Sequence, residues 1–112
     1  ESIPLTTFEY FEFGNPANKA EYDYIKSYSP YDNIKPANYP AVLVTSSLYD
    51  SQVQYYEPAK YVPKLRDNTT SKNPIIMKMN LVGGHAGKSG RLNALEESAL
   101  DNAFLINLVK SN

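Results

Sequence analysis

Two short apolar runs, separated by a segment of helical length, limit this chain to few folds. Residues 41–46 are rich in β-branched side chains and follow Pro40, and residues 75–81 form a second apolar run. Both runs predict buried β-strands, because each is short and bounded by residues that favour turns. Between them, apolar side chains recur every three residues from Tyr56 to Leu65, which predicts a helix of about 10 residues.

The remaining segments complete a predicted element order of α-β-α-β-α, in the α/β class. Residues 1–18 mix Pro and Gly with aromatic and acidic side chains, which predicts a loop with at most one helical turn. Residues 21–28 have apolar side chains at helical spacing before Pro30, which predicts a short helix. Two strands joined by a helix predict a parallel pair with a right-handed crossover.

The two longer helices carry finer expectations. Pro63 removes a backbone donor and crowds the carbonyl of Ala59, at a cost of about 3 kcal/mol in a regular helix. A kink or a late start is therefore predicted in that helix. The last helix is predicted over residues 92–109, with Asn93 and Glu96 forming a capping box. Its predicted buried face consists of Leu92, Leu95, Ala99, Ala103, Ile106 and Val109.

Two parallel strands are too few to form a self-contained sheet. Such a pair leaves both strands as edges and their faces only partly covered. The 112 residues give room for one domain, and the chain starts with Glu1 in place of Met, which predicts a piece of a longer polypeptide. Alone, we expect marginal stability, pairing with a partner, self-association, or exchange of segments with a second copy.

Composition excludes several classes of partner. The formal charge is -1, with 11 basic and 12 acidic residues interspersed, so no basic stripe is available for nucleic acid or an anionic membrane. The apolar runs are far shorter than the roughly 20 residues of a membrane-spanning helix. Zinc-type His/Cys pairs and carboxylate-rich calcium loops are missing, so we expect no metal and no cofactor. The absence of cysteine fits a reducing compartment, and we expect a cytoplasmic location.

One carboxylate and the single histidine follow the two predicted strands. Asp50 comes just after the first strand, and His85 lies in the glycine-rich loop after the second. Because parallel strands end at the same edge of a sheet, we expect the two side chains to meet there. In acyl transfer a histidine acts as general base and a carboxylate orients it, and acid before histidine is the α/β-hydrolase order. The alternative is a surface aspartate and an unrelated loop histidine.

Two further patterns limit this hypothesis. The chain contains no Gly-x-Ser-x-Gly nucleophile elbow, so we expect that it cannot carry out acyl transfer alone. Residues 83–89 approach the phosphate-binding pattern Gly-x4-Gly-Lys-Ser/Thr, but Val82 stands where the first glycine is required. Starting from Gly83 leaves only three residues before Gly87, one too few, which disfavours nucleotide binding.

Four segments carry a more specific resemblance. They read PLTTFEYFEFGNP, YIKSYSPYDN, YDSQVQYYEPAKYVPKLR and GGHAGKSGR. Together they resemble the carboxyl-terminal end of oligopeptidase B, a group of serine peptidases in the prolyl oligopeptidase family, over nearly the whole chain. The resemblance implies that residues 1–112 are the carboxyl-terminal part of an α/β-hydrolase catalytic domain, without its nucleophile region and β-propeller. It also implies that Asp50 and His85 are the triad acid and base.

The resemblance further implies cleavage of short peptides after Arg or Lys. It assigns part of this selectivity to acidic residues in the segment matching Thr6–Gly14, where Glu9 and Glu12 match the pattern Gly-Glu-x-Glu-Glu-Trp and Phe11 replaces an acidic residue. A pair of carboxylates can bind a guanidinium through two hydrogen bonds. The alternative is that Glu9 and Glu12 are solvent-facing loop carboxylates.

The sequence therefore favours the terminal part of a serine oligopeptidase that supplies Asp50 and His85. The alternative hypothesis is a remnant or split-gene product without catalytic activity, which acts as a structural or interaction module by docking onto an upstream fragment.

Overall fold

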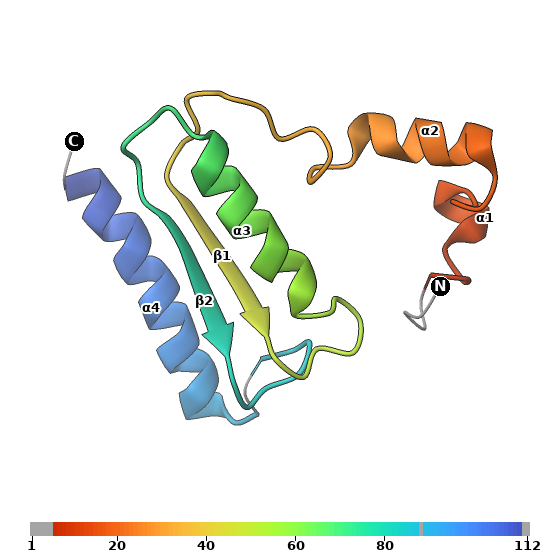
Figure 1. The fold of residues 1–112 in the computed structure, drawn as a ribbon. Helices are drawn as coiled ribbons and strands as arrows, with labels where there is room; N and C mark the ends of the chain where they lie inside the picture. Colours follow the sequence, from red (N-terminus) through yellow and green to blue (C-terminus); the bar gives the residue numbers. More distant parts are fainter. Residues whose placement is uncertain (1–5, 88, 111–112) are drawn as a thin grey trace.

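The structure, a computed structural model, describes residues 6–87 and 89–110. Residues 1–5 of the predicted amino-terminal loop and Lys88 of the predicted glycine-rich turn lie outside the described residues. Apart from one additional helical turn near the amino terminus, the observed order is the predicted one (Figure 1). The elements are α1 (Tyr10–Phe13), α2 (Lys19–Tyr28), β1 (Val42–Ser47), α3 (Tyr56–Asn68), β2 (Ile75–Asn80) and α4 (Arg91–Lys110).

The two strands pair in parallel, as predicted. Their register runs from Val42 opposite Ile75 to Ser47 opposite Asn80. A further backbone hydrogen bond, from Leu48 N–H to the carbonyl of Asn80 at 2.8 Å, joins the chain just beyond the two strand ends. The segments that follow β1 and β2 therefore leave the sheet side by side.

Helices α3 and α4 cover opposite faces of this sheet. On one face, Val62 and Leu65 of α3 pack against Ile75 to form the buried core, with Val42, Val44 and Met77 partly buried around it. Because side chains alternate along a strand, Lys78 and Asn80 point to the other face. There they form hydrogen bonds with Glu97 and Asp101 of α4.

Helix α3 begins where the apolar spacing begins, and it ends three residues later than that spacing. It starts at Tyr56 and continues through Pro63 to Asn68 as one helix of 13 residues. The late start that Pro63 predicted is therefore not observed, since Pro63 lies inside the helix. Val62 and Leu65 are 1% and 2% exposed, and their burial on either side of Pro63 offsets the lost backbone hydrogen bond.

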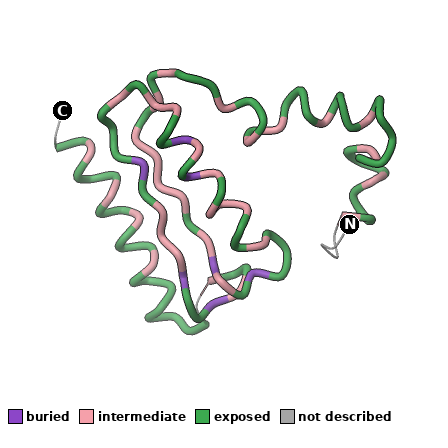
Figure 2. The backbone as a smooth tube through the Cα atoms, viewed as in Figure 1, coloured by how far each residue is buried: buried purple, intermediate pink, exposed green. Residues whose placement is uncertain are grey.

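The predicted details of α4 are wrong in two respects. The helix begins at Arg91, so Asn93 lies inside the first turn, where its amide donates to the carbonyl of Ser89, and it caps nothing together with Glu96. The predicted buried face is exposed, with Leu92 at 76% and Val109 at 77% (Figure 2). The half-buried residues lie on the opposite side and are Glu97, Asp101, Phe104 and Leu108.

The amino-terminal helices form an arm that extends away from the sheet, beyond α3 (Figure 1). Helix α2 begins two residues before the predicted position because Asn18 caps it: the Asn18 carboxamide accepts from Ala20 N–H, and Glu21 accepts from the Asn18 amide. Lys64 of α3 holds the end of the arm, since its Nζ lies 4.0 Å from the Tyr31 ring centroid and donates to the Tyr31 carbonyl.

Candidate active site

Asp50 occupies the turn that leaves β1. Its carboxylate oxygen Oδ1 accepts hydrogen bonds from the backbone N–H groups of Gln52 and Val53, each at 2.9 Å, which closes the turn locally. The side chain is only 9% exposed. The Val53 N–H lowers the pKa of the Asp50 carboxyl from its usual value of 3.8; burial opposes this shift, and Gln52 and His85 reinforce it.

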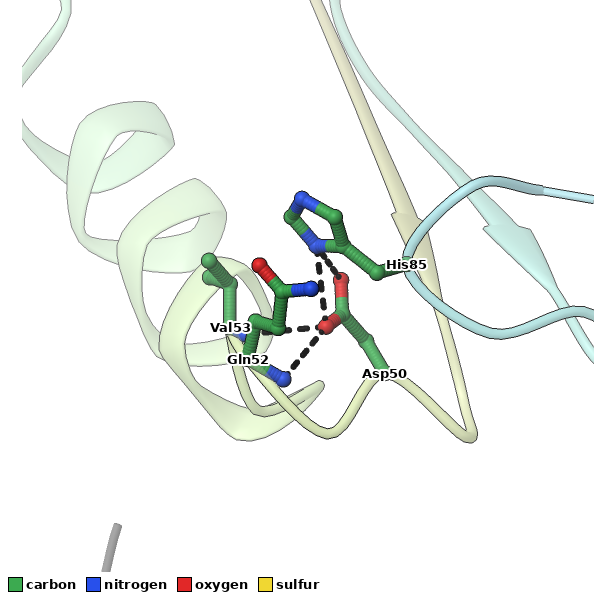
Figure 3. Close-up of polar contacts among 4 residues, drawn as sticks. All are labelled: Asp50, Gln52, Val53 and His85. Atoms are coloured by element: carbon green, nitrogen blue, oxygen red, sulfur yellow. Dashed lines mark hydrogen bonds and ion pairs between the residues drawn. The ribbon is translucent and has the colours of Figure 1, made fainter. Parts of the chain in front are cut away.

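His85 lies in a tight turn that faces Asp50. Gly87 N–H donates to the Gly84 carbonyl at 3.0 Å, and Gly87 has φ of 78°, a backbone conformation that favours glycine. His85 Nδ1 lies 3.1 Å from Oδ1 and 3.0 Å from Oδ2 of Asp50 (Figure 3). The structure thus brings together the two residues that the sequence analysis placed at one edge of the sheet.

Asp50 and His85 differ in their exposure to solvent. The Asp50 side chain is 9% exposed, whereas the His85 side chain is 49% exposed. Since the carboxylate contacts Nδ1, that nitrogen carries the proton in the neutral imidazole and Nε2 is an acceptor. Within residues 6–87 and 89–110, Nε2 has no hydrogen-bond partner and points away from Asp50 (Figure 3). A buried acid therefore holds a base whose second nitrogen is accessible.

Two side chains that sequence reasoning missed hold the histidine turn. Asn80, the last residue of β2, is 8% exposed, and its Oδ1 accepts from Val82 N–H at 3.0 Å and Gly83 N–H at 2.9 Å. Its amide donates to Glu97 Oε1 of α4 at 2.5 Å. An Asn three residues before a Gly-Gly pair is a turn signal that could have indicated the first role. The sequence gives no signal for Glu97.

An open cavity of about 680 Å³ adjoins the pair. Its walls come from the ends of β1 and β2, the start of α3, the histidine turn, α4 and the segment 29–31 that follows α2. Glu9 and Glu12 do not line it. Both are exposed on the α1 arm, which lies away from this edge of the sheet (Figure 1). Of the four predicted site residues, the structure therefore brings Asp50 and His85 together and leaves Glu9 and Glu12 apart from them.

The described residues contain neither a candidate metal site nor a candidate membrane-spanning helix. Over residues 6–87 and 89–110, no three His, Cys, Asp or Glu side chains are grouped as a metal site. In the same ranges, none of the helices combines the length and apolar character needed to span a bilayer.

A parallel β-α-β unit with a carboxylate after its first strand and a histidine after its second is the arrangement found at one end of an α/β-hydrolase sheet. Comparison with known sequences then identifies the family within this class. The sequence pattern of the prolyl oligopeptidase family matches residues 1–112, and the chain belongs to this family.

Curated relatives and solved structures agree with this assignment. The chain is 54% identical over 105 residues to a dipeptidyl aminopeptidase BI from Pseudoxanthomonas mexicana, covering 94% of this chain and 14% of the relative. It is 49% identical to Protease 2 from Moraxella lacunata, covering 94% of this chain and 15% of that protein. Both relatives are therefore much longer than the 112 residues compared with them.

The structural neighbours include oligopeptidase B from Leishmania major, with a TM-score of 0.94 and 44% identity, covering 98% of this chain and 15% of that one. Oligopeptidase B from Trypanosoma brucei, solved in a closed form with covalently bound antipain, has a TM-score of 0.90 and 43% identity, with 95% and 15% coverage. The fold of the chain is thus that of a part of oligopeptidase B.

Proposed function

We propose that this chain supplies the acid and the base of a serine peptidase active site. His85 Nε2 takes the proton from a serine hydroxyl as the serine attacks the peptide carbonyl, and then delivers it to the leaving amine. Asp50 keeps the proton on Nδ1 and stabilises the imidazolium that forms. The observation that carries this proposal is the contact of His85 Nδ1 with both carboxylate oxygens, at 3.0 and 3.1 Å.

The electrostatics of Asp50 support the same role. A carboxylate that orients a general base has to stay ionised while the imidazole gains and loses a proton. Backbone N–H groups of Gln52 and Val53 donate to Asp50 and favour its ionised form. These donors are part of the turn itself, so they do not depend on the protonation state of His85.

The nucleophile belongs to a part of the protein outside these 112 residues. No Gly-x-Ser-x-Gly elbow occurs in the sequence, and the relatives are so long that this chain covers only 14–15% of them. The covalently bound antipain in the trypanosomal oligopeptidase B supports covalent chemistry at such a site. The absence of cysteine fits a cytoplasmic enzyme.

The proposed substrates are short peptides cleaved after Arg or Lys. Glu9 and Glu12 are the candidates for contact with the basic side chain, through charge-assisted hydrogen bonds. They lie apart from Asp50 and His85 here, so this part of the proposal depends on the fit to the oligopeptidase B pattern at these two positions.

A peptidase assay with a fluorogenic Arg peptide tests the proposal. The 112-residue chain should release no fluorophore, whereas the longer protein that contains it should, and Asp50→Asn in the longer protein should lower kcat by roughly 10⁴-fold because the imidazole loses its orienting anion. Glu9→Gln should raise KM for the Arg peptide and not for one with a neutral residue. Inhibitor-sensitive turnover by the isolated chain would overturn the proposed origin of the nucleophile. A longer protein without turnover would favour the interaction module.

A further inference from the structure

The turn that carries His85 is attached to the rest of the fold by Asn80 and Glu97. Asn80 uses both functions of its carboxamide: the oxygen accepts from the first two N–H groups of the turn, Val82 and Gly83, and the nitrogen donates to Glu97. At 8% exposure, Asn80 is largely shielded from bulk water. A buried amide with these partners has one favourable orientation, because any other leaves polar groups unpaired.

Gly83 and Gly87, near the two ends of the turn, approach Asn80 and Glu97 closely. A Cβ built on Gly83 would lie 2.5 Å from the Gly87 carbonyl oxygen and 2.9 Å from Asn80 Nδ2, so the turn closes directly on Asn80. A Cβ on Gly87 would lie 2.5 Å from Glu97 Oε2. One Glu97 oxygen therefore binds the Asn80 amide while the other lies against Gly87, two residues beyond the histidine.

Helix α4 is itself fixed to β2 at this level. Lys78 Nζ donates to the Glu97 carbonyl at 3.2 Å and to Asp101 Oδ1 at 2.8 Å. The Lys78 side chain is 21% exposed, so the ion pair with Asp101 is partly shielded from water. This attachment sets the position of Glu97 along the strand and leaves its carboxylate free to contact Asn80 and the turn.

We propose that Asn80 and Glu97 are positioning residues that place the His85 imidazole against Asp50. They touch neither reacting atom, and they act by fixing the turn of residues 82–87 from both ends. This inference rests on the proposed role of His85 as general base. Removing either residue should leave Asp50 in place, since the Asp50 turn is closed by Gln52 and Val53, while the histidine turn gains freedom.

The test reads the histidine itself, because His85 is the only histidine in the chain. Long-range ¹H–¹⁵N NMR spectra of the neutral imidazole distinguish a proton on Nδ1 from one on Nε2. In the unsubstituted chain we expect the Nδ1–H form. Glu97→Ala and Asn80→Ala should shift the population toward the Nε2–H form, whereas Glu97→Gln should retain Nδ1–H, since its amide oxygen still accepts from Asn80. Glu96→Ala, an exposed neighbour on α4, is the matched control.

The possible results separate this inference from the proposed function. If folded Glu97→Ala and Asn80→Ala chains, checked by circular dichroism, keep the Nδ1–H form, the positioning role is wrong. If the unsubstituted chain already has the Nε2–H form, the Asp50–His85 pairing is wrong instead. Should Asn80→Ala fail to fold, the comparison of Glu97→Ala with Glu97→Gln tests the positioning role alone. In the longer protein, Glu97→Ala should lower kcat roughly 10- to 100-fold with KM unchanged, and Glu97→Gln should restore it.

Discussion

At the scale of single residues, Asp50 combines a structural and a chemical role in one carboxylate. Its Oδ1 closes the turn after β1, and both oxygens face the His85 ring. The sequence was sufficient to predict this contact, because strand ends in a parallel pair lie together whatever the rest of the sheet does. It could not reveal Glu97, which is 17 positions from Asn80 in the chain and reaches it only through helix packing.

The lowered pKa of Asp50 predicts how stability depends on pH. The ionised form of Asp50 is more stable in the folded chain than in the unfolded chain. The contribution of Asp50 to the free energy of unfolding is therefore complete well above the usual pKa of 3.8, and it is lost as the pH falls through the lower pKa of the folded chain. Urea unfolding followed by circular dichroism should therefore show a stability difference between the unsubstituted chain and Asp50→Asn that is constant near neutrality and shrinks below about pH 4.

A His85 variant provides a control for this pH dependence, because His85 is only one of the groups that lower the pKa of Asp50. The N–H groups of Val53 and Gln52 together lower the pKa of Asp50 more than His85 does. His85→Ala should therefore retain most of the pH dependence, which Asp50→Asn removes. A dependence that vanishes in His85→Ala would mean that the imidazole, and not the turn, is the main stabiliser of the Asp50 anion.

At the scale of elements, the strands and α3 followed from local pattern, and the orientation of α4 did not. Helix α4 has apolar side chains on more than one side, so periodicity alone could not decide which side packs on the sheet. Side chains of the sheet determine which side of α4 packs. Lys78 and Asn80 project from β2 toward α4 and select the stripe that contains Glu97 and Asp101, with Phe104 completing it. Buried polar groups require partners, and this requirement overrode the more apolar stripe.

The histidine turn yields a prediction from two adjacent glycines. Gly83→Ala would put a Cβ 2.5 Å from the Gly87 carbonyl oxygen, a contact with backbone that only a shift of the turn can relieve. Gly84→Ala would put its Cβ 3.5 Å from the Tyr49 carbonyl oxygen, an ordinary contact. Gly83→Ala should therefore displace His85 and lower kcat of the longer protein by on the order of 100-fold, with Gly84→Ala near the unsubstituted rate.

The same two variants in the 112-residue chain give a measurement that does not require activity. The histidine NMR signals should change in Gly83→Ala and remain close to those of the unsubstituted chain in Gly84→Ala. Equal effects of the two substitutions would show that the close approach of Gly83 to Gly87 does not determine the geometry of the turn.

The small core between α3 and the sheet gives a second prediction at this scale. Leu65 is 2% exposed and packs with Val62 and Ile75, so Leu65→Ala should lower the free energy of unfolding by about 2 to 5 kcal/mol. Leu100 of α4 is 52% exposed, and Leu100→Ala should change stability much less, by about 0.5 kcal/mol. Thermal and urea unfolding measure both. Similar losses for the two variants would contradict the location of the core.

At the scale of the whole molecule, the chain is more extended than its length requires. A compact chain of this size has a radius of gyration of about 13 Å, and the observed value is 16.6 Å. The arm of α1 and α2, which extends away from the sheet, contributes to this difference (Figure 1), and one side of α4 is left exposed (Figure 2). The position of the arm could not be predicted, because it depends on the stacking of Lys64 on Tyr31, a contact between residues 33 positions apart.

The exposed apolar side of α4 predicts that the isolated chain self-associates. Leu95 and Ile106, 57% and 52% exposed, lie on the uncovered side of α4, where burial of apolar surface against a second copy lowers the free energy of both. Sedimentation velocity from micromolar to near-millimolar concentration should show a rising average mass. Leu95→Lys with Ile106→Lys should abolish the rise, because a buried lysine requires a partner.

The arm supplies the control for that experiment. Phe11 on α1 is fully exposed, so Phe11→Lys removes a comparable apolar side chain from a different surface. If α4 is the contact, the Phe11 variant should associate like the unsubstituted chain. Loss of association in the Phe11 variant alone would locate the contact on the arm and point to exchange of α1 and α2 between copies.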